Sequence, residues 1–411
     1  MKTLIIAPFS PYPLVFGGAI RLYHVIKMFA AISDVTVLAY NTVKDKAASE
    51  RHLATICERA ILVDGAPLET QRKWLLQARG LLGTKSFQYH SFYTRHFQRE
   101  IDARLAAQRF DYIVVEQSQM GFFRCRQPGA VHILDLQNIE YELLERRAKV
   151  QSNPVKGLAL AVEATKFKRQ ELGIAEQYDL VFTPSEREAA HLGGILKGPR
   201  VACLANSIDP DFFPMRAEQP TANEIAFVGT THVDANRDGL IYFMEQVFPL
   251  IERRVPDVRF SIVGGKPPAE IRAYGERPNV EVTGFVDDVR PYMARAKALV
   301  VPLRSGGGTR LKILEGLSFG VPTVSTSIGA EGIDLTDGKE ILIGDTPERF
   351  AERVVQSLTD AALCRRVAAA GRLLVEERYS WQAVGRQLAA CLDEAASRRG
   401  PAQPVPSAAA D

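Results

Sequence analysis

The sequence predicts an α/β protein made of two domains, each a mostly parallel sheet covered by helices. Strand-length apolar runs alternate with helix-length periodic segments along most of the chain. The alternation pauses once, at a proline-containing stretch, and then restarts. A length of 411 residues also exceeds what one ordinary hydrophobic core organises. We therefore expect two doubly wound domains facing each other across a cleft, with the carboxyl strand ends lining it.

The first domain is expected over residues 1–205. Its strand-length runs are 3–9, 34–40, 60–64, 112–117, 131–136, 180–185 and 201–208. The connection 9–18 is long for a loop between a strand and a helix, and Gly17 and Gly18 end it just before a helix expected over 19–31. Functional loops in such sheets follow the carboxyl ends of strands. These two glycines are therefore predicted site residues, with a simple turn as the alternative.

A linker is expected over 206–223, which contains three prolines and no clean hydrophobic period. The second domain is expected over 224–378. Its strand-length runs are 224–229, 258–265, 280–285, 298–303, 322–326 and 340–345.

Three helical segments follow the last strand, at 347–358, 361–378 and 381–396, and Ser380 is a suitable cap for the third. Because three helices exceed the needs of one more strand–helix unit, we expect the segment 379–396 to pack back on the first domain. The remainder, 397–411, is rich in Pro, Ala and Ser and is predicted to be disordered.

Composition excludes several classes of protein. A hydrophobic fraction of 46% with 24% charged residues is typical of a soluble globular protein, and a net charge of +3 argues against a dedicated nucleic-acid binder. The five cysteines are far apart with no C-x-x-C, which fits a reducing cytoplasm and offers no zinc site. Pro8 interrupts the first apolar run, so we expect a buried strand there rather than a signal peptide.

Basic residues gather at 146–169, around the apolar segment VKGLALAV. Such a stretch can rest on an anionic membrane surface or hold a charged acceptor. The alternative is the solvated face of an ordinary helix. The sequence thus predicts a cytoplasmic protein with a candidate peripheral contact at the inner face of the membrane.

The stretch from Arg304 to Thr326 carries the clearest site pattern. The apolar run 298–303 predicts a buried strand, and Gly306, Gly307 and Gly308 then allow a sharp turn close to a ligand. Thr309 is the expected N-cap of a helix over 310–319, which Gly320 ends.

This stretch suits an anion, because free amides, the helix dipole and two cations, Arg310 and Lys312, meet where a phosphate could sit. Glu315 lies on the same helix face as Lys312, three residues on. The alternative is a plain connecting turn with a surface ion pair between these two residues. The stretch is no P-loop, since G-x-x-x-x-G-K-[ST] is absent, and the chain has no G-x-G-x-x-G.

The second half resembles the donor domain of family-four retaining nucleotide-sugar glycosyltransferases, which have the GT-B fold of two Rossmann-like domains. The resemblance rests on FVGTTHVDANRDGLIYF (227–243), FSIVGGKPP (260–268), VTGFVDDVRPYMARAKALVVPL (282–303), RSGGGTRLKILEGLSFGVPTVSTSIGAEGI (304–333) and YSW (379–381). The first half matches more loosely, through PFSPYPLVFGGAIR and LDLQNIEYE.

The resemblance implies transfer of a sugar from a nucleoside diphosphate, UDP or GDP, to a glycan, lipid-linked or small-molecule acceptor, as in polysaccharide biosynthesis. Arg310 and Lys312 would stabilise the leaving diphosphate in place of a metal, so no cofactor is expected. Glu315 would bind the ribose, and Gly284, Phe285 and Val286 the base. The implied donor site comprises Gly17, Gly18, Asn138, Gly229, Arg237, Gly284, Phe285, Val286, Gly306, Gly307, Gly308, Thr309, Arg310, Leu311, Lys312 and Glu315.

Two positions depart from the family pattern. Gly307 stands where many relatives carry a sugar-contacting glutamate, which places this chain with a subgroup of the form GGGTR-x-K. Gln137 stands where relatives often carry a histidine. A glutamine cannot exchange a proton as an acid or base, but it can donate a hydrogen bond to the reacting sugar, and we expect Gln137 to act in this way beside Arg310 and Lys312.

Two other functions remain open at this point. A nucleotide-sugar epimerase of the same fold would need acid/base carboxylates and histidines, and the seven histidines show no suitable pairing. A non-catalytic nucleotide-sugar-binding partner of another transferase would account for Gln137 and Gly307. On the retaining mechanism discussed for the family, the departing phosphate oxygen takes the acceptor proton, so no protein nucleophile is required.

Overall fold

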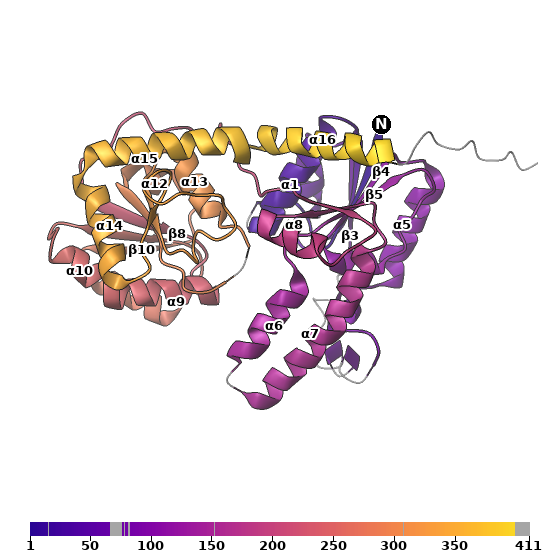
Figure 1. Cartoon of the computed structure of the whole chain (residues 1–411), viewed down its shortest axis with the longest axis horizontal. Helices are drawn as coiled ribbons and strands as arrows, with labels where there is room; N and C mark the ends of the chain where they lie inside the picture. The colour runs from indigo at the N-terminus through magenta and orange to yellow at the C-terminus, as the bar shows by residue number, and fades with distance from the viewer. Residues whose placement is uncertain are drawn as a thin grey trace, which may run out of the picture. The chain divides into compact units, whose positions relative to one another are not determined.

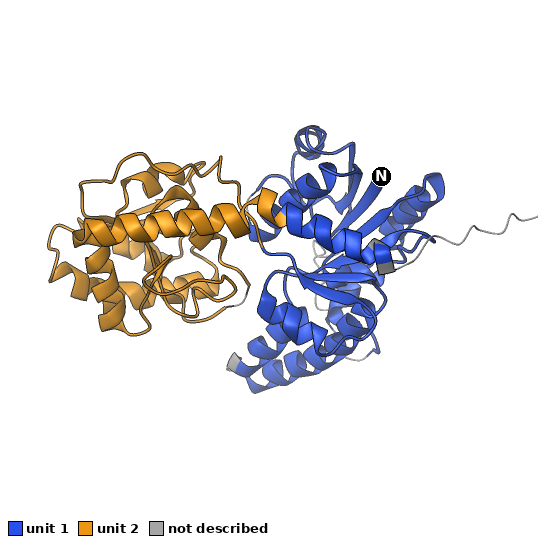
Figure 2. Cartoon of the chain, turned by 45° about the horizontal axis from the view of Figure 1, so that its top comes forward, with its two compact units in different colours: residues 1–205, 385–411 blue, residues 206–384 orange. Residues whose placement is uncertain are grey.

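The computed structural model describes residues 1–14, 16–65, 76–77, 79–80, 83–151, 153–306 and 308–398. Gly307 and most of the predicted disordered tail, 399–411, therefore lie outside the described residues. The chain divides into two compact units, which Figure 2 colours separately. Unit 1 comprises residues 1–205 and 385–411, and unit 2 comprises residues 206–384. The stretch expected as a linker, 206–223, thus belongs to unit 2.

Unit 1 contains a parallel sheet of seven strands in the order β3-β2-β1-β4-β5-β6-β7. The strands are β1 (Lys2–Ala7), β2 (Asp34–Tyr40), β3 (Arg59–Val63), β4 (Tyr112–Glu116), β5 (Val131–Asp135), β6 (Leu180–Thr183) and β7 (Arg200–Cys203). Strands β4 and β5 are buried along their whole length, as their uninterrupted apolar runs predict. The order reverses direction between β1 and β4, which places the topological switch point there.

The helices of unit 1 fill the connections between these strands (Figure 1). They are α1 (Gly17–Ala30), α2 (Lys46–Leu53), α4 (Phe87–Phe92), α5 (Arg95–Ala107), the short 3₁₀ helix η2 (Ser118–Phe122), α6 (Glu140–Val150), α7 (Pro154–Ala175) and α8 (Glu186–Gly193). Helices α6 and α7 pack side by side as a hairpin (Figure 1). Pro154 stands at the start of α7, where its missing N–H costs nothing, and Asn153 caps the helix.

Unit 2 contains a second parallel sheet, of six strands in the order β10-β9-β8-β11-β12-β13. The strands are β8 (Glu224–Val228), β9 (Arg259–Val263), β10 (Val280–Gly284), β11 (Ala298–Val301), β12 (Thr323–Ser325) and β13 (Leu342–Ile343). The helical segments are α9 (Asp234–Tyr242), η3 (Phe243–Val247), α10 (Phe248–Glu252), α11 (Ala269–Ala273), η4 (Tyr274–Glu276), α12 (Arg290–Arg295), α13 (Leu311–Phe319), α14 (Pro347–Thr359), α15 (Ala361–Leu374) and η5 (Val375–Tyr379).

The last helix, α16 (Trp381–Arg398), joins unit 1 as predicted. From Gly385 onward its residues belong to unit 1, where Gly385 lies against Met28 and Arg200 pairs with Glu394 at 2.5 Å. The Ser380 hydroxyl accepts the Ala383 amide at 3.1 Å, which confirms the predicted cap. Among the described residues, none of the helices has both the length and the apolar composition that crossing a bilayer requires.

Candidate active site

The switch point of the unit 2 sheet lies between β8 and β11, which are neighbours in the sheet. Two loops leave its carboxyl edge there. One follows β8 and begins at Gly229, and the other follows β11 and leads into α13. Ligands of open parallel sheets bind at this place, because the two connections diverge to opposite faces and leave a crevice.

The start of α13 differs from the prediction by one residue. The N-cap is Arg310, with extended backbone, so Thr309 is not the cap and Arg310 is not helical. The Thr309 hydroxyl instead lies buried beside Gly332 without a hydrogen-bond partner among the described residues. No described side chain caps the helix, which leaves its first amides for a ligand. Gly320 ends the helix in the left-handed conformation, as predicted (φ 74°).

Lys312 lies in the first turn of α13 and points toward the loop after β8. Its Nζ donates to Asn236 Oδ1 at 3.0 Å and lies 4.1 Å from the centroid of the Phe227 ring. A side chain at Gly229 would place its Cβ 2.4 Å from this Nζ, and the φ of Gly229 is 151°. The φ favours glycine there, and a side chain would displace the Lys312 ammonium from its observed position. Burial lowers the pKa of Lys312 to about 7, with nearby Arg310 adding to the effect and Glu315 opposing it.

Glu315 is half-buried one turn further along the same helix face. Burial raises the pKa of its carboxyl to about 7, and Lys312 opposes that shift. The alternative of a surface ion pair between Lys312 and Glu315 is not what the structure shows, because no nitrogen–oxygen contact within 4.0 Å joins them. The Glu315 carboxylate also makes no hydrogen bond to any residue that the structure describes. Its acceptor oxygens are therefore available to hydroxyl groups of a ligand.

The glycine loop before α13 has the backbone conformations that glycine allows. Gly306 has φ 118° and Gly308 has φ 74°. The Arg310 guanidinium folds back over this loop, donating from Nη1 to the Gly308 carbonyl, and its Nη2 would lie 2.9 Å from a Cβ at Gly306. Gly307, which stands where many relatives of the resembled family carry a glutamate, lies outside the described residues.

The residues expected at the base lie at the end of β10, on the same carboxyl edge but two strands away from β8. Gly284 has φ 72°, and Phe285 is 72% exposed, against Gly265. Gly264, which the sequence reading did not single out, cannot carry a side chain, since a Cβ there would lie 1.9 Å from the Gly229 carbonyl oxygen. The absence of a side chain at Gly264 thus lets the loops after β8 and β9 lie close together.

Arg237 lies in α9, but its guanidinium faces carboxylates, Asp234 at 3.1 Å and Glu270 at 3.9 Å. Its role as a second phosphate cation stays a prediction. The preceding residue, Asn236, is the one that contacts Lys312, and it also donates to the Thr230 carbonyl at 2.9 Å. Sequence reasoning missed Asn236. The signal that could have identified Asn236 is its position. It is a polar residue in the first turn of the helix that follows the first strand of the domain.

The predicted residues of unit 1 meet at its own switch point, between β1 and β4. Gly17 and Gly18 form the first turn of α1, with Phe16 as N-cap, so the expected helix start at residue 19 is wrong by two residues. Gln137 donates to the Gly18 carbonyl at 3.3 Å. A Cβ at Gly18 would lie 2.5 Å from Gln137 Oε1, which explains why glycine stands there. Asn138 follows Gln137 and is half-buried.

Two further residues at this edge escaped the sequence reading. Gln117 donates to Gln137 Oε1 at 3.0 Å from a backbone with φ 65°, a conformation that costs a non-glycine residue ~1–3 kcal/mol. Glu116 accepts from Gln137 Nε2 at 3.4 Å and is fully buried. The Gln137 amide is thus held on three sides.

A buried charge cluster lies beneath Gln137. Glu116 and Asp135 end neighbouring strands directly opposite each other, and Arg21 reaches Asp135 from α1. Arg21 donates to both Asp135 oxygens, with an Nε–Oδ2 distance of 3.0 Å, and to the Leu204 carbonyl at 2.7 Å. Burial raises the pKa of Glu116 well above its ordinary value, and the Asp135 charge raises it further against the effect of Arg21.

Comparison with known sequences bears on unit 2 most directly. Residues 222–360 match the family model described as "Glycosyl transferases group 1". An uncharacterized 44.6 kDa protein in the cps region of Klebsiella pneumoniae is 20% identical over 393 residues, which cover 92% of this chain and 96% of that protein. The GDP-mannose-dependent alpha-(1-6)-phosphatidylinositol monomannoside mannosyltransferase of Mycobacterium tuberculosis is 30% identical over 156 residues, 34% of this chain and 40% of the enzyme.

Comparison with solved structures covers both units. Sucrose-phosphate synthase from Thermosynechococcus elongatus has a TM-score of 0.71 at 17% identity, over 97% of this chain and 100% of that one. An Anabaena protein solved in complex with UDP and glucose has a TM-score of 0.65 at 12% identity, over 96% and 100% of the two chains. At these identities the likeness concerns the fold, and it confirms the predicted two-domain α/β architecture.

Proposed function

We propose that this chain, which has the GT-B fold, is a glycosyltransferase that transfers a sugar from a nucleoside diphosphate to an acceptor hydroxyl with retention of configuration and without a metal. The observation that carries this proposal is the beginning of α13. An uncapped helix N-terminus, the Lys312 ammonium and the unbonded Glu315 carboxylate lie together at a topological switch point. These are the groups that a diphosphate and a ribose require.

The chemistry follows from the charges. As the bond between the sugar carbon and the diphosphate oxygen breaks, its electron pair stays on the phosphate, whose negative charge grows. The α13 amides, Arg310 and Lys312 would stabilise that charge. In the free protein Lys312 has a pKa of about 7, and a bound diphosphate would favour its protonated form. The acceptor oxygen would bond to the sugar carbon while its proton passes to the departing phosphate oxygen.

Gln137 would orient the reacting sugar rather than exchange a proton. Its amide is held by Gln117, Glu116 and the Gly18 carbonyl, so its position is defined before substrate binds. Metal independence is part of the proposal because the diphosphate charge that a metal ion could neutralise would meet two cations, Arg310 and Lys312, at the start of α13. The cations near α13 would take that role.

Thermal denaturation with nucleoside diphosphates tests the donor. Related proteins supply the two bases to try first, since one is named as GDP-mannose-dependent and another was solved with UDP. At a ligand concentration of 100 Kd, binding adds ~2.7 kcal/mol to the free energy of unfolding, enough for a shift of several degrees. Lys312→Ala should abolish the shift and lower kcat by ~10²–10³-fold, whereas the exposed Lys339→Ala should change neither. No shift with any nucleoside diphosphate would refute the proposal.

We also propose that the protein acts at the cytoplasmic face of a membrane, on a glycan or lipid-linked acceptor. The turn end of the α6–α7 hairpin carries the exposed side chains of Val155 (76%) and Leu158 (69%), next to Lys149 and Lys156. Apolar and basic groups together suit an anionic bilayer surface. Cosedimentation with anionic vesicles should fall when Val155 and Leu158 are both changed to serine. Equal binding by the double variant would remove this part of the proposal.

A further inference from the structure

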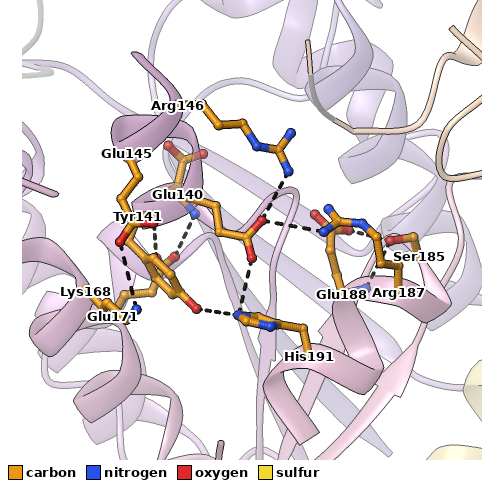
Figure 3. Close-up of polar contacts among 11 residues, drawn as sticks. Glu140, Tyr141, Glu145, Arg146, Lys168, Glu171, Ser185, Arg187, Glu188 and His191 are labelled. Atoms are coloured by element: carbon orange, nitrogen blue, oxygen red, sulfur yellow. Dashed lines mark hydrogen bonds and ion pairs between the residues drawn. The ribbon is translucent and has the colours of Figure 1, made fainter. Parts of the chain in front are cut away.

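A separate polar pocket lies in unit 1 where α6, α7 and α8 meet (Figure 3). Its volume is about 180 Å³, far more than the ~10–15 Å³ that one ordered water needs. Side chains from all three helices line it, among them Tyr141, Glu142, Arg146, Lys168 and His191. None of these residues belongs to the donor site described above.

Tyr141 gives the pocket a fixed wall. Its ring is almost fully buried, its hydroxyl lies 2.8 Å from His191 Nε2, and Lys168 Nζ lies 4.7 Å from the ring centroid. The backbone amide of Tyr141 also donates to the buried Glu171 carboxylate at 2.9 Å. Contacts on ring, hydroxyl and backbone hold this side chain in one place, as a binding site requires.

The charges in the pocket are unbalanced. Glu142 is shared by three partners, with Arg146 at 3.3 Å, His191 at 3.3 Å and Arg187 at 3.7 Å. Arg187 also interacts with Glu188, so Arg146 and His191 are the two pocket-lining groups that share Glu142.

Lys168 forms a long ion pair with Glu145, with a nitrogen–oxygen distance of 3.8 Å. Lys149 also lines the pocket, and no carboxylate among the described residues lies within ion-pair distance of it. The lining of the pocket therefore contains three cations, Arg146, Lys149 and Lys168, against two carboxylates, Glu142 and Glu145, and can accept a further anion.

The pocket also lies close to the reacting edge of unit 1. Helix α6 begins at Glu140, three residues after Gln137, on the loop that leaves β5. At 1.5 Å of rise per residue, Arg146 lies ~9 Å along the helix from Glu140. Three residues of chain and this rise together place Arg146 at most ~20 Å from Gln137, which an extended acceptor with a phosphate group can span.

We propose that this pocket binds a phosphate group of the acceptor. Guanidinium groups match phosphate oxygens in a bidentate manner, and the Lys168 ammonium adds a point charge from the opposite wall. Only the word acceptor rests on the proposed function. The anion site itself follows from the charges and the cavity.

Calorimetric titration with glycerol 3-phosphate tests the site without donor or turnover. The titration uses the full chain carrying Lys312→Ala, so that the cation of the donor site does not contribute. Arg146→Gln should weaken binding at least tenfold, because it replaces a charge-assisted hydrogen bond to the phosphate by a neutral one. Arg147→Gln is the matched control, because it makes the same charge change one residue away at an exposed position. Lys168→Gln, on the other wall, should behave as Arg146→Gln does.

The outcomes are distinct. Equal losses in the Arg146 and Arg147 variants would show a general charge effect and overturn the proposal, as would unchanged affinity in folded Arg146→Gln and Lys168→Gln. Vesicles of phosphatidylcholine with and without phosphatidic acid distinguish the source of the phosphate. Loss of vesicle binding in Arg146→Gln, with glycerol 3-phosphate binding already shown, would assign a lipid phosphate. Retention would assign a soluble phosphate. If no sugar transfer is ever found, these binding results stand unchanged.

Discussion

Replacing Gly229 by alanine is expected to disable donor binding while leaving the fold intact. The φ of Gly229 is 151°, a conformation that costs a side-chain-bearing residue ~1–3 kcal/mol. The new Cβ would lie 2.4 Å from Lys312 Nζ, whereas ordinary contacts begin at 3.4 Å, so the ammonium must move by about 1 Å. That movement would disturb the 3.0 Å hydrogen bond to Asn236. A displacement of this size near reacting groups costs on the order of 10²-fold in rate.

The assay is steady-state transfer together with donor-induced thermal shift. Gly229→Ala should lower kcat/KM by about 10²-fold and lower the melting temperature by a few degrees. Gly173→Ala is the control, because Gly173 lies in α7 with nothing within 4 Å of a new Cβ. It should keep activity and gain up to ~1 kcal/mol from its better helix propensity. Wild-type donor affinity and kcat in Gly229→Ala would refute the inference that Lys312 must occupy its observed position.

Three further predictions concern unit 1. Gly18→Ala should lower kcat with little change in donor affinity, measured by initial rates, because its Cβ would lie 2.5 Å from Gln137 Oε1. Glu171→Gln should flatten the pH dependence of stability in urea unfolding. Burial raises the pKa of Glu171 to about 7, so its stabilisation is complete below the unfolded pKa of ~4.3 and is lost as pH rises through 7, by about 4 kcal/mol in the wild type. An unchanged slope in the variant would contradict this assignment. Arg21→Met should cost ~3–5 kcal/mol of unfolding free energy because it leaves the buried Asp135 carboxylate without its partner, and a loss under 1 kcal/mol would argue against an ionised pair.

Local rules were sufficient for the strands. The run 298–303 predicts a buried strand, and β11 is buried along its whole length at the centre of its sheet. The cap at Ser380 and the left-handed Gly320 were equally predictable, since each depends on a few neighbouring residues. The cap at Thr309 was not. Its hydroxyl lies beside Gly332, which belongs to a loop further along the chain. No rule based on neighbouring residues predicts such a contact.

The candidate site also contains residues that the sequence predicted and partners that only the folded structure reveals. The sequence pointed to Lys312 and Gln137, but their partners, Asn236 and the Gly18 carbonyl, are 76 and 119 residues away along the chain. The sequence also suggested an ion pair between Lys312 and Glu315, and the folded chain instead gives each group a separate, poorly solvated place.

The sequence by itself determined the alternation of strands and helices, the order of the two domains and the glycines at the turns. These depend on hydrophobic period and backbone freedom, which act over a few residues. Only the tertiary structure decided which glycine faces Lys312, which carboxyl lies beneath Gln137 and that Tyr141 lines a pocket with His191. Those outcomes depend on strand order, because parallel neighbours such as β4 and β5 bring together side chains from distant parts of the chain at one edge of a sheet.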